Sequence, residues 1–275
     1  MDPIAPAKTA IDLISRGWTL FKQRRDPVRA QAARVLVAFE AHGVKPQQIA
    51  RLLPASIEVK TTAWTSAETL KDATTPALLQ WTANTLALDP AWLDGERICR
   101  HVAFTAHYKH PAQLFNWLRE RYQRSDKTQW EAGASLCVLC ACDAPMTNTA
   151  NGPLVLMLRE TFAEVNGSER YRYTLLSEGW RLDHTPCTAS LAAACAIAQH
   201  MHLPIHALTA SARQLRALEE GKCFAGEVWT TAKARWHPDD FVKAPPGKDT
   251  EWMQAIRKEA RRMLADDKLG HLMPD

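Results

Sequence analysis

Proline and glycine interrupt the first third of this 275-residue chain at short intervals, which restricts that region to short helices. Proline fits the first turn of a helix but disrupts its interior, and glycine commonly ends a helix. Asp26 and Pro27 therefore predict the start of a helix that Gly43 ends. A shorter helix is expected to begin at Pro46 and to run through Leu53, before Pro54.

Further helices are expected on both sides of this pair. Apolar side chains recur at helical spacing over 7–22, and Pro76 opens a clear helical pattern to Leu86. A final helical turn is expected over 91–95, whereas the apolar residues of 55–73 follow neither helical nor strand spacing clearly. The pattern predicts five short helices and an all-helical domain over residues 1–96.

The pattern changes after Gly95 and predicts a small α+β domain over 97–229. Asn166-Gly167 lies between two apolar runs, which is typical of a β-hairpin turn. Prolines within 230–249 indicate a linker, so 230–275 is expected to hold a linker and a C-terminal helix. The remaining segments are expected to be helices at 97–123, 186–201, 210–220 and 249–268, and strands at 135–143, 153–165, 170–177 and 204–208.

Composition places few limits on the function. The formal net charge is only +4, which is too small to indicate nucleic-acid binding from the overall charge. Seven cysteines without regular disulfide spacing predict reduced thiols and a cytoplasmic protein. The chain contains no run of about 20 apolar residues, which a membrane-spanning helix would need. It also contains no glycine-rich phosphate loop. We therefore expect no membrane association, no cofactor and no bound metal.

The phrase Leu86-Ala87-Leu88-Asp89-Pro90-Ala91-Trp92-Leu93-Asp94-Gly95 follows the predicted helices. With the helix, Gly43 and short helix before it, residues 28–96 resemble lambda-repressor-like (Cro/C1-type) helix-turn-helix domains. The resemblance covers about a quarter of the chain, and its motif is more specific at the C-terminal end. It implies a helix that reads base edges in the major groove of duplex DNA. The sequence departs from the family where that helix belongs, because 57–72 contains no clean helical pattern.

The resemblance implies a set of polar and basic side chains that would contact DNA. Segment 36–96 carries four basic and seven acidic side chains, a net charge of −3 that disfavours phosphate contact. Basic residues beside the domain would compensate for this charge, although a solvated helix end is the more common explanation of so short a basic run. The predicted DNA-contacting residues are Arg24, Arg25, Arg29, Gln47, Gln48, Lys60, Thr61, Thr62, Ser66 and Lys71.

Cysteine and histidine supply the other candidate sites. Cys187 is expected near a helix N-terminus with His184 nearby as a base, a combination that favours a nucleophilic thiol. No residue can be assigned to orient that histidine. Cys137, Cys140 and Cys142 lack a second ligand pair for zinc, so we interpret them as strand residues that pack as small hydrophobes.

Three functions remain open at this point. The leading hypothesis is a transcriptional regulator that binds double-stranded DNA as a homodimer and uses its α+β domain for ligand sensing or assembly. The alternative is a non-enzymatic adaptor that uses a repressor-like fold to bind a protein partner through exposed tryptophans such as Trp64 and Trp252. The third hypothesis is a thiol enzyme centred on Cys187. We expect a protein that is not an enzyme.

Overall fold

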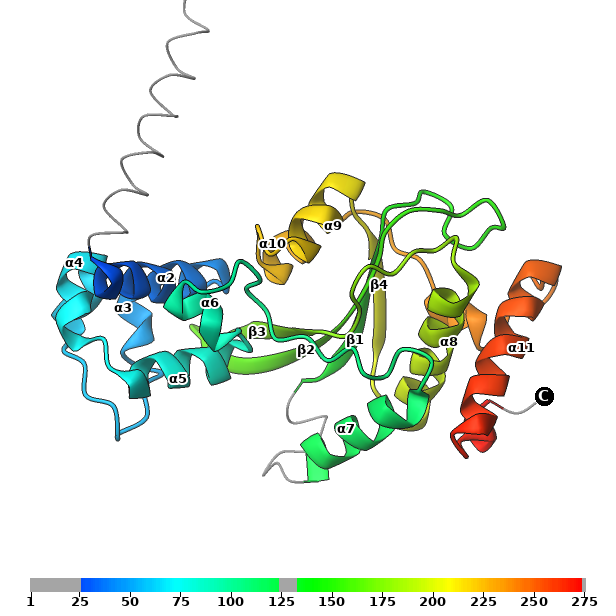
Figure 1. Cartoon of the computed structure of the whole chain (residues 1–275), viewed down its shortest axis with the longest axis horizontal. Coiled ribbons are helices and arrows are strands. Elements are labelled where there is room, and N and C mark those ends of the chain that lie inside the picture. Colours follow the sequence, from blue (N-terminus) through cyan, green and yellow to red (C-terminus); the bar gives the residue numbers. More distant parts are fainter. Residues whose placement is uncertain (1–25, 124–132, 274–275) are drawn as a thin grey trace, which may run out of the picture. The chain divides into compact units, whose positions relative to one another are not determined.

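The computed structural model describes residues 26–123 and 133–273 (Figure 1). Its contacts divide the chain into two compact units. Unit 1 comprises Met1–Asn84 and Pro90–Arg97, and unit 2 comprises Thr85–Asp89 and Ile98–Asp275. The predicted α+β class is confirmed, with a helical N-terminal region, a mixed sheet and a C-terminal helix.

Unit 1 consists of short helices where the structure describes it. The expected helix after Asp26 is confirmed as α2, since the Asp26 side chain accepts a hydrogen bond from the Arg29 N–H at 2.9 Å and Pro27 occupies the first turn. The helices of the unit are α2 (Pro27–Ala41), α3 (Pro46–Ile49), η1 (Thr61–Thr65), α4 (Ala67–Leu70), η2 (Lys71–Ala73), α5 (Pro76–Leu86) and α6 (Pro90–Asp94).

The middle of unit 1 differs from the expectation. Helix α3 ends at Ile49, four residues before Leu53. The stretch without a clear period becomes three separate helical turns, the second of which Ser66 caps by accepting from the Thr69 N–H at 3.2 Å. Side-chain hydroxyl groups that bond to the nearby backbone compete with a continuous helix, which explains the division.

Large side chains from successive helices fill the interior of unit 1. Phe39 of α2 and Trp64 of η1 are buried, and the Phe39 ring stacks on Trp81 of α5 with centroids 5.4 Å apart. Leu78 and Leu93 are also buried, on α5 and α6. The apolar sides of α2, α5 and α6 are therefore buried inside the unit.

Unit 2 is built on a four-stranded sheet of order β3-β2-β1-β4. Neighbours β1, β2 and β3 are antiparallel, and Asn166 and Gly167 form the β2–β3 turn with φ of 53° and 73° as the hairpin pattern predicts. β4 runs parallel to β1 because helix α8 carries the chain back across the sheet. The strands are β1 (Ser135–Cys140), β2 (Leu154–Val165), β3 (Ser168–Leu175) and β4 (Ile205–Thr209).

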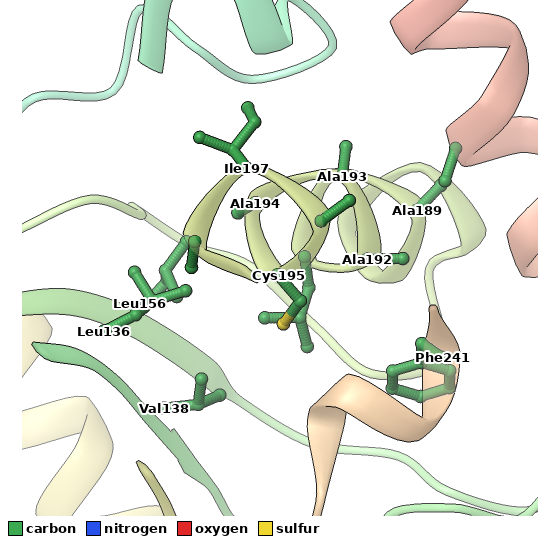
Figure 2. Packing of buried hydrophobic residues seen from close by; sticks show 14 of the residues in the cluster. Leu136, Val138, Leu156, Ala189, Ala192, Ala193, Ala194, Cys195, Ile197 and Phe241 are labelled. Carbon is green, nitrogen blue, oxygen red and sulfur yellow. The ribbon is translucent and has the colours of Figure 1, made fainter. Parts of the chain in front are cut away.

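Helices cover both faces of this sheet (Figure 1). One face packs Leu136 and Val138 against α8 and α11, as Figure 2 shows for α8. The opposite face packs Cys137 and Leu139 against α9 and α10. Strand β1 is buried throughout because its alternating side chains enter two separate cores. The helices are α7 (Pro111–Gln123), α8 (Thr185–His200), α9 (Ala212–Glu219), α10 (Ala225–Thr231), η3 (Pro238–Phe241), α11 (Glu251–Asp266) and η4 (Gly270–Leu272).

Two segments of unit 2 differ from their predicted structure. The helix expected over 97–123 begins only at Pro111, because the residues before it extend along the sheet edge and the Phe104 N–H donates to the Leu175 carbonyl at 2.8 Å. The expected linker is packed: η3 buries Phe241 in the α8 core (Figure 2), and α11 then lies against α8.

Candidate functional site

Two of the basic residues predicted to contact DNA are engaged in an ion-pair network within unit 1. Arg29 pairs with Glu68 at 2.9 Å, and Lys71 pairs with Glu68 at 2.5 Å and with Asp26 at 3.4 Å. The hydrogen bond from the Arg29 N–H, and then Lys71, hold the pKa of Asp26 below its usual range. Since two cations and two carboxylates meet here, Arg29 and Lys71 add little net positive charge to this surface.

Four other predicted residues remain exposed on one stretch of chain, 45–62, which we call the polar stretch. Gln47, Lys60, Thr61 and Thr62 are all exposed. The stretch carries three cations, Lys45, Arg51 and Lys60, against one carboxylate, Glu58, a net charge of +2. Helix η1 packs on α3, so the two ends of the stretch are neighbours in the fold.

The remaining predicted residues have structural roles or fall outside the described part. The Gln48 Oε1 accepts from the Lys45 N–H at 2.8 Å and so closes the start of α3. Ser66 caps α4. Arg24 and Arg25 lie outside the described residues, as does the helix expected over 7–22. The structure therefore brings together only part of the predicted set.

The described residues of unit 1 do not form a helix-turn-helix. Helix α3 has four residues, and the next helical turn, η1, begins only at Thr61. A recognition helix needs several consecutive turns to present side chains along the major groove. The family resemblance therefore remains a prediction that rests on the ending around Trp92 and on the order of the helices.

A groove lies between α2, α5 and α6 of unit 1, with a volume of about 410 Å³. Its lining includes the apolar side chains of Val28, Leu79 and Leu93, together with the polar groups of Gln31 and Asp94, which hydrogen-bond to each other at 2.9 Å. Val28 is 41% exposed, so part of its apolar side chain is accessible in the groove. Sequence patterns did not indicate this groove, because it forms between helices that are distant along the chain.

Cys187 and His184 lie together at the start of α8, as the sequence predicts. The His184 Nδ1 is 3.2 Å from the Cys187 Sγ, and Cys187 is the third residue of the helix. Burial, followed by the charge and hydrogen bonding of Cys187, raises the pKa of Tyr108, so Tyr108 is a further neighbour of this thiol. No sequence pattern links Tyr108 to this cysteine, since only the tertiary fold brings them together.

The surroundings of Cys187 resemble a packed interior more than an open active site. Its exposed fraction is 5%, and it belongs to the α8 core. No carboxylate or amide of the described residues orients the ring of His184 through the second nitrogen. The contact can support a thiol nucleophile chemically, but it lacks the third member and the access that such sites use.

The strand cysteines do not converge on a metal site. Cys137 and Cys140 enter opposite cores, and the Cys140 Sγ donates to the Cys142 carbonyl at 3.8 Å. Burial raises the pKa of Cys137 to about 11 and that of Cys140 to about 12, so both thiols stay protonated near neutral pH. Across 26–123 and 133–273, no three His, Cys, Asp or Glu side chains are grouped to hold a metal ion.

Comparison with known proteins finds no match among protein-family models, curated proteins or solved structures. Within the part of the chain that the structure describes, no helix has the length and apolarity to cross a membrane.

Proposed function

We propose that this protein is a DNA-binding regulator that contacts duplex DNA through the polar stretch of unit 1. The observation that carries the proposal is the state of Lys45, Arg51 and Lys60. All three are exposed, and none forms an ion pair within the described residues. Exposed cations without a carboxylate partner are available to neutralise phosphates, whereas Arg29 and Lys71 are not.

The proposal concerns phosphate contacts more than base recognition. Phosphate contacts position a protein on the duplex, while base-edge contacts provide sequence specificity. Gln47, Thr61 and Thr62 are the exposed neutral side chains of the stretch that could reach base edges or phosphates. Three cations alone provide modest affinity, so binding as a homodimer that doubles these contacts forms part of the proposal.

Fluorescence anisotropy with a labelled duplex tests the proposal. We expect binding at about 50 mM salt that weakens steeply as salt is raised. Each of Lys45→Gln, Arg51→Gln and Lys60→Gln should lower the slope of log affinity against log salt by about one. Lys71→Gln is the matched control, because its charge is already paired, and it should leave the slope nearly unchanged. Absence of binding by the unaltered protein at low salt would overturn the proposal.

An adaptor that binds a protein partner is the second candidate, and the groove beside Val28 favours it. Trp64 does not support it, because that side chain is only 1% exposed, and Trp252 is half-buried. A photo-cross-linking residue at position 28 should then capture a partner in cells, and the same residue at Val37, which is exposed on α2 outside the groove, should not. Equal capture from both positions would contradict this candidate.

A further inference from the structure

Three basic side chains of unit 2 lie on one face of the sheet, spread along the length of β1. Ser135 of β1 pairs with Arg159 of β2, and Cys137 of β1 pairs with His206 of β4. Directly paired residues share a face, as do residues two apart on a strand. Leu208, two residues after His206, bridges to Arg235 beyond the sheet edge. Arg159, His206 and Arg235, the sheet-face cluster, therefore lie on the same side.

The guanidinium of Arg159 is held in place by neighbours that leave most of its donors free. Its Nε donates to the Ser135 Oγ at 3.0 Å. Its Cζ lies 4.5 Å from the centroid of the Tyr171 ring and 5.8 Å from that of Trp229. Aromatic faces attract the cation without using its N–H groups. Neither terminal nitrogen hydrogen-bonds to any described residue, so a planar pair of donors remains available.

No described carboxylate forms an ion pair with the sheet-face cluster. Glu169 is the acidic side chain beside it on β3, and its carboxylate accepts from the Tyr171 hydroxyl at 2.6 Å and from the Thr161 hydroxyl at 3.4 Å. Burial, and then the charges of Arg159 and Arg235, lower the pKa of His206, which agrees with positive groups in close proximity. Arg159 and Arg235 carry like charges on this face without an ion pair to a described carboxylate, and a bound anion relieves their repulsion.

We propose that the sheet-face cluster binds a small phosphate-bearing ligand. A fixed arginine fork matches two phosphate oxygens, and the side chains of His206 and Arg235 supply further donors or charge on the same face. The proposal does not depend on DNA binding by unit 1, since it concerns residues of unit 2 and is measured without DNA.

Isothermal titration calorimetry with pyrophosphate at constant ionic strength tests this site. We expect Arg159→Gln to weaken binding about tenfold or more, because hydrogen bonds to a charged group are lost. Arg235→Gln is a second test variant that should also weaken binding, and because Arg235 is exposed, its loss should not disturb the fold. Arg213→Gln on α9, which is exposed and has no ion pair with the described residues, is the control and should bind as the unaltered protein does.

Two outcomes would overturn the proposal. One is that the unaltered protein shows no heat of binding at about 1 mM pyrophosphate. The other is that Arg159→Gln and Arg235→Gln, both folded by circular dichroism, bind as tightly as the unaltered protein. If pyrophosphate does not bind but Arg159→Gln weakens binding of a DNA duplex, the cluster contacts nucleic acid instead, and the small-ligand proposal is wrong.

Discussion

Glu160 shows how one buried residue can control the stability of unit 2. Its side chain is 3% exposed on β2, and Arg121 of α7 and Arg172 of β3 pair with it at 2.5 and 3.2 Å. The Tyr122 hydroxyl donates to it as well, at 3.2 Å. Burial opposes the ionisation of Glu160, but the hydrogen bonds and charge of Arg121 outweigh burial and hold its pKa below the usual range. The network ties α7 to two strands.

We expect Glu160→Gln to lower the free energy of unfolding by about 3 kcal/mol at pH 7, because it leaves two half-buried cations without their buried carboxylate. A carboxyl group with a depressed folded pKa contributes stability above its unfolded pKa of about 4.3, and that contribution is lost as the pH falls through the folded pKa. Urea unfolding at pH 7 and at about pH 3 should therefore show a smaller pH effect in the variant. Glu164→Gln, exposed on the same strand, should match the unaltered protein. A variant as stable as the unaltered protein would contradict the role of the network.

The rate at which Cys187 is alkylated distinguishes a packed thiol from an activated nucleophile. Cys99 is exposed, whereas Cys187 is 5% exposed in the α8 core. Because alkylation needs access to the thiolate, we expect a small alkylating reagent at pH 8 to modify Cys99 first and Cys187 more slowly, with mass spectrometry identifying each site. If Cys187 reacts faster than Cys99 and His184→Ala abolishes that advantage, a thiol enzyme becomes the better explanation.

Helix α9 ends at a glycine whose backbone conformation and surroundings both disfavour a side chain. Gly221 follows this helix with φ of 69°, and a Cβ at this position would lie 2.5 Å from the Cys99 Cα and 2.6 Å from the Ile98 carbonyl oxygen. Gly167 has a similar φ of 73° in the β2–β3 turn, but a Cβ there would meet nothing within 4 Å. An added side chain would strain the backbone at both Gly167 and Gly221, but only Gly221 also lacks space for a Cβ.

We expect Gly167→Ala to lower the free energy of unfolding by about 1 kcal/mol, which is the cost of a left-handed conformation for alanine. Gly221→Ala should cost about 3 kcal/mol or more, since the backbone at Ile98 and Cys99 must move as well. Thermal or urea unfolding of both variants measures the difference. Equal effects would show that the segment before α7 does not pack tightly on the end of α9.

The whole molecule contains two units with separate cores, which should be visible in its unfolding. Scanning calorimetry should resolve two transitions, because multidomain chains commonly depart from two-state behaviour. The larger enthalpy should belong to unit 2, since enthalpy scales with the number of residues. Glu160→Gln should lower the midpoint of that transition only. A single transition, shifted as a whole by Glu160→Gln, would show that the units unfold cooperatively.

Local patterns predicted many elements of this fold, and their success has a local cause. α2, α5 and the β2–β3 hairpin follow from Pro27, Pro76 and Asn166-Gly167, whose backbone preferences act within a few residues. The helix expected before Pro111 and the linker expected over 230–249 did not form. Those segments pair with distant strands or pack on α8, and such contacts leave no periodic signal in the sequence.

The candidate sites were less predictable than the fold. The approach of His184 to Cys187 could be expected, because the two residues lie three apart at a helix start. The pairing of Lys71 with Asp26 could not, nor could the placement of Arg159 and His206 on one face of the sheet, since each depends on strands or helices that meet only in the folded chain.

By itself, the sequence determined the α+β class, the helical N-terminal region and most helix starts, because turn residues and apolar periodicity act over short distances. Only the tertiary structure decided which basic residues are free to bind an anion. It paired Arg29 and Lys71 with carboxylates, left Lys45, Arg51 and Lys60 without them, and assembled the sheet-face cluster. The availability of a charge for binding depends on its neighbours in space, and the order of residues along the chain does not specify those neighbours.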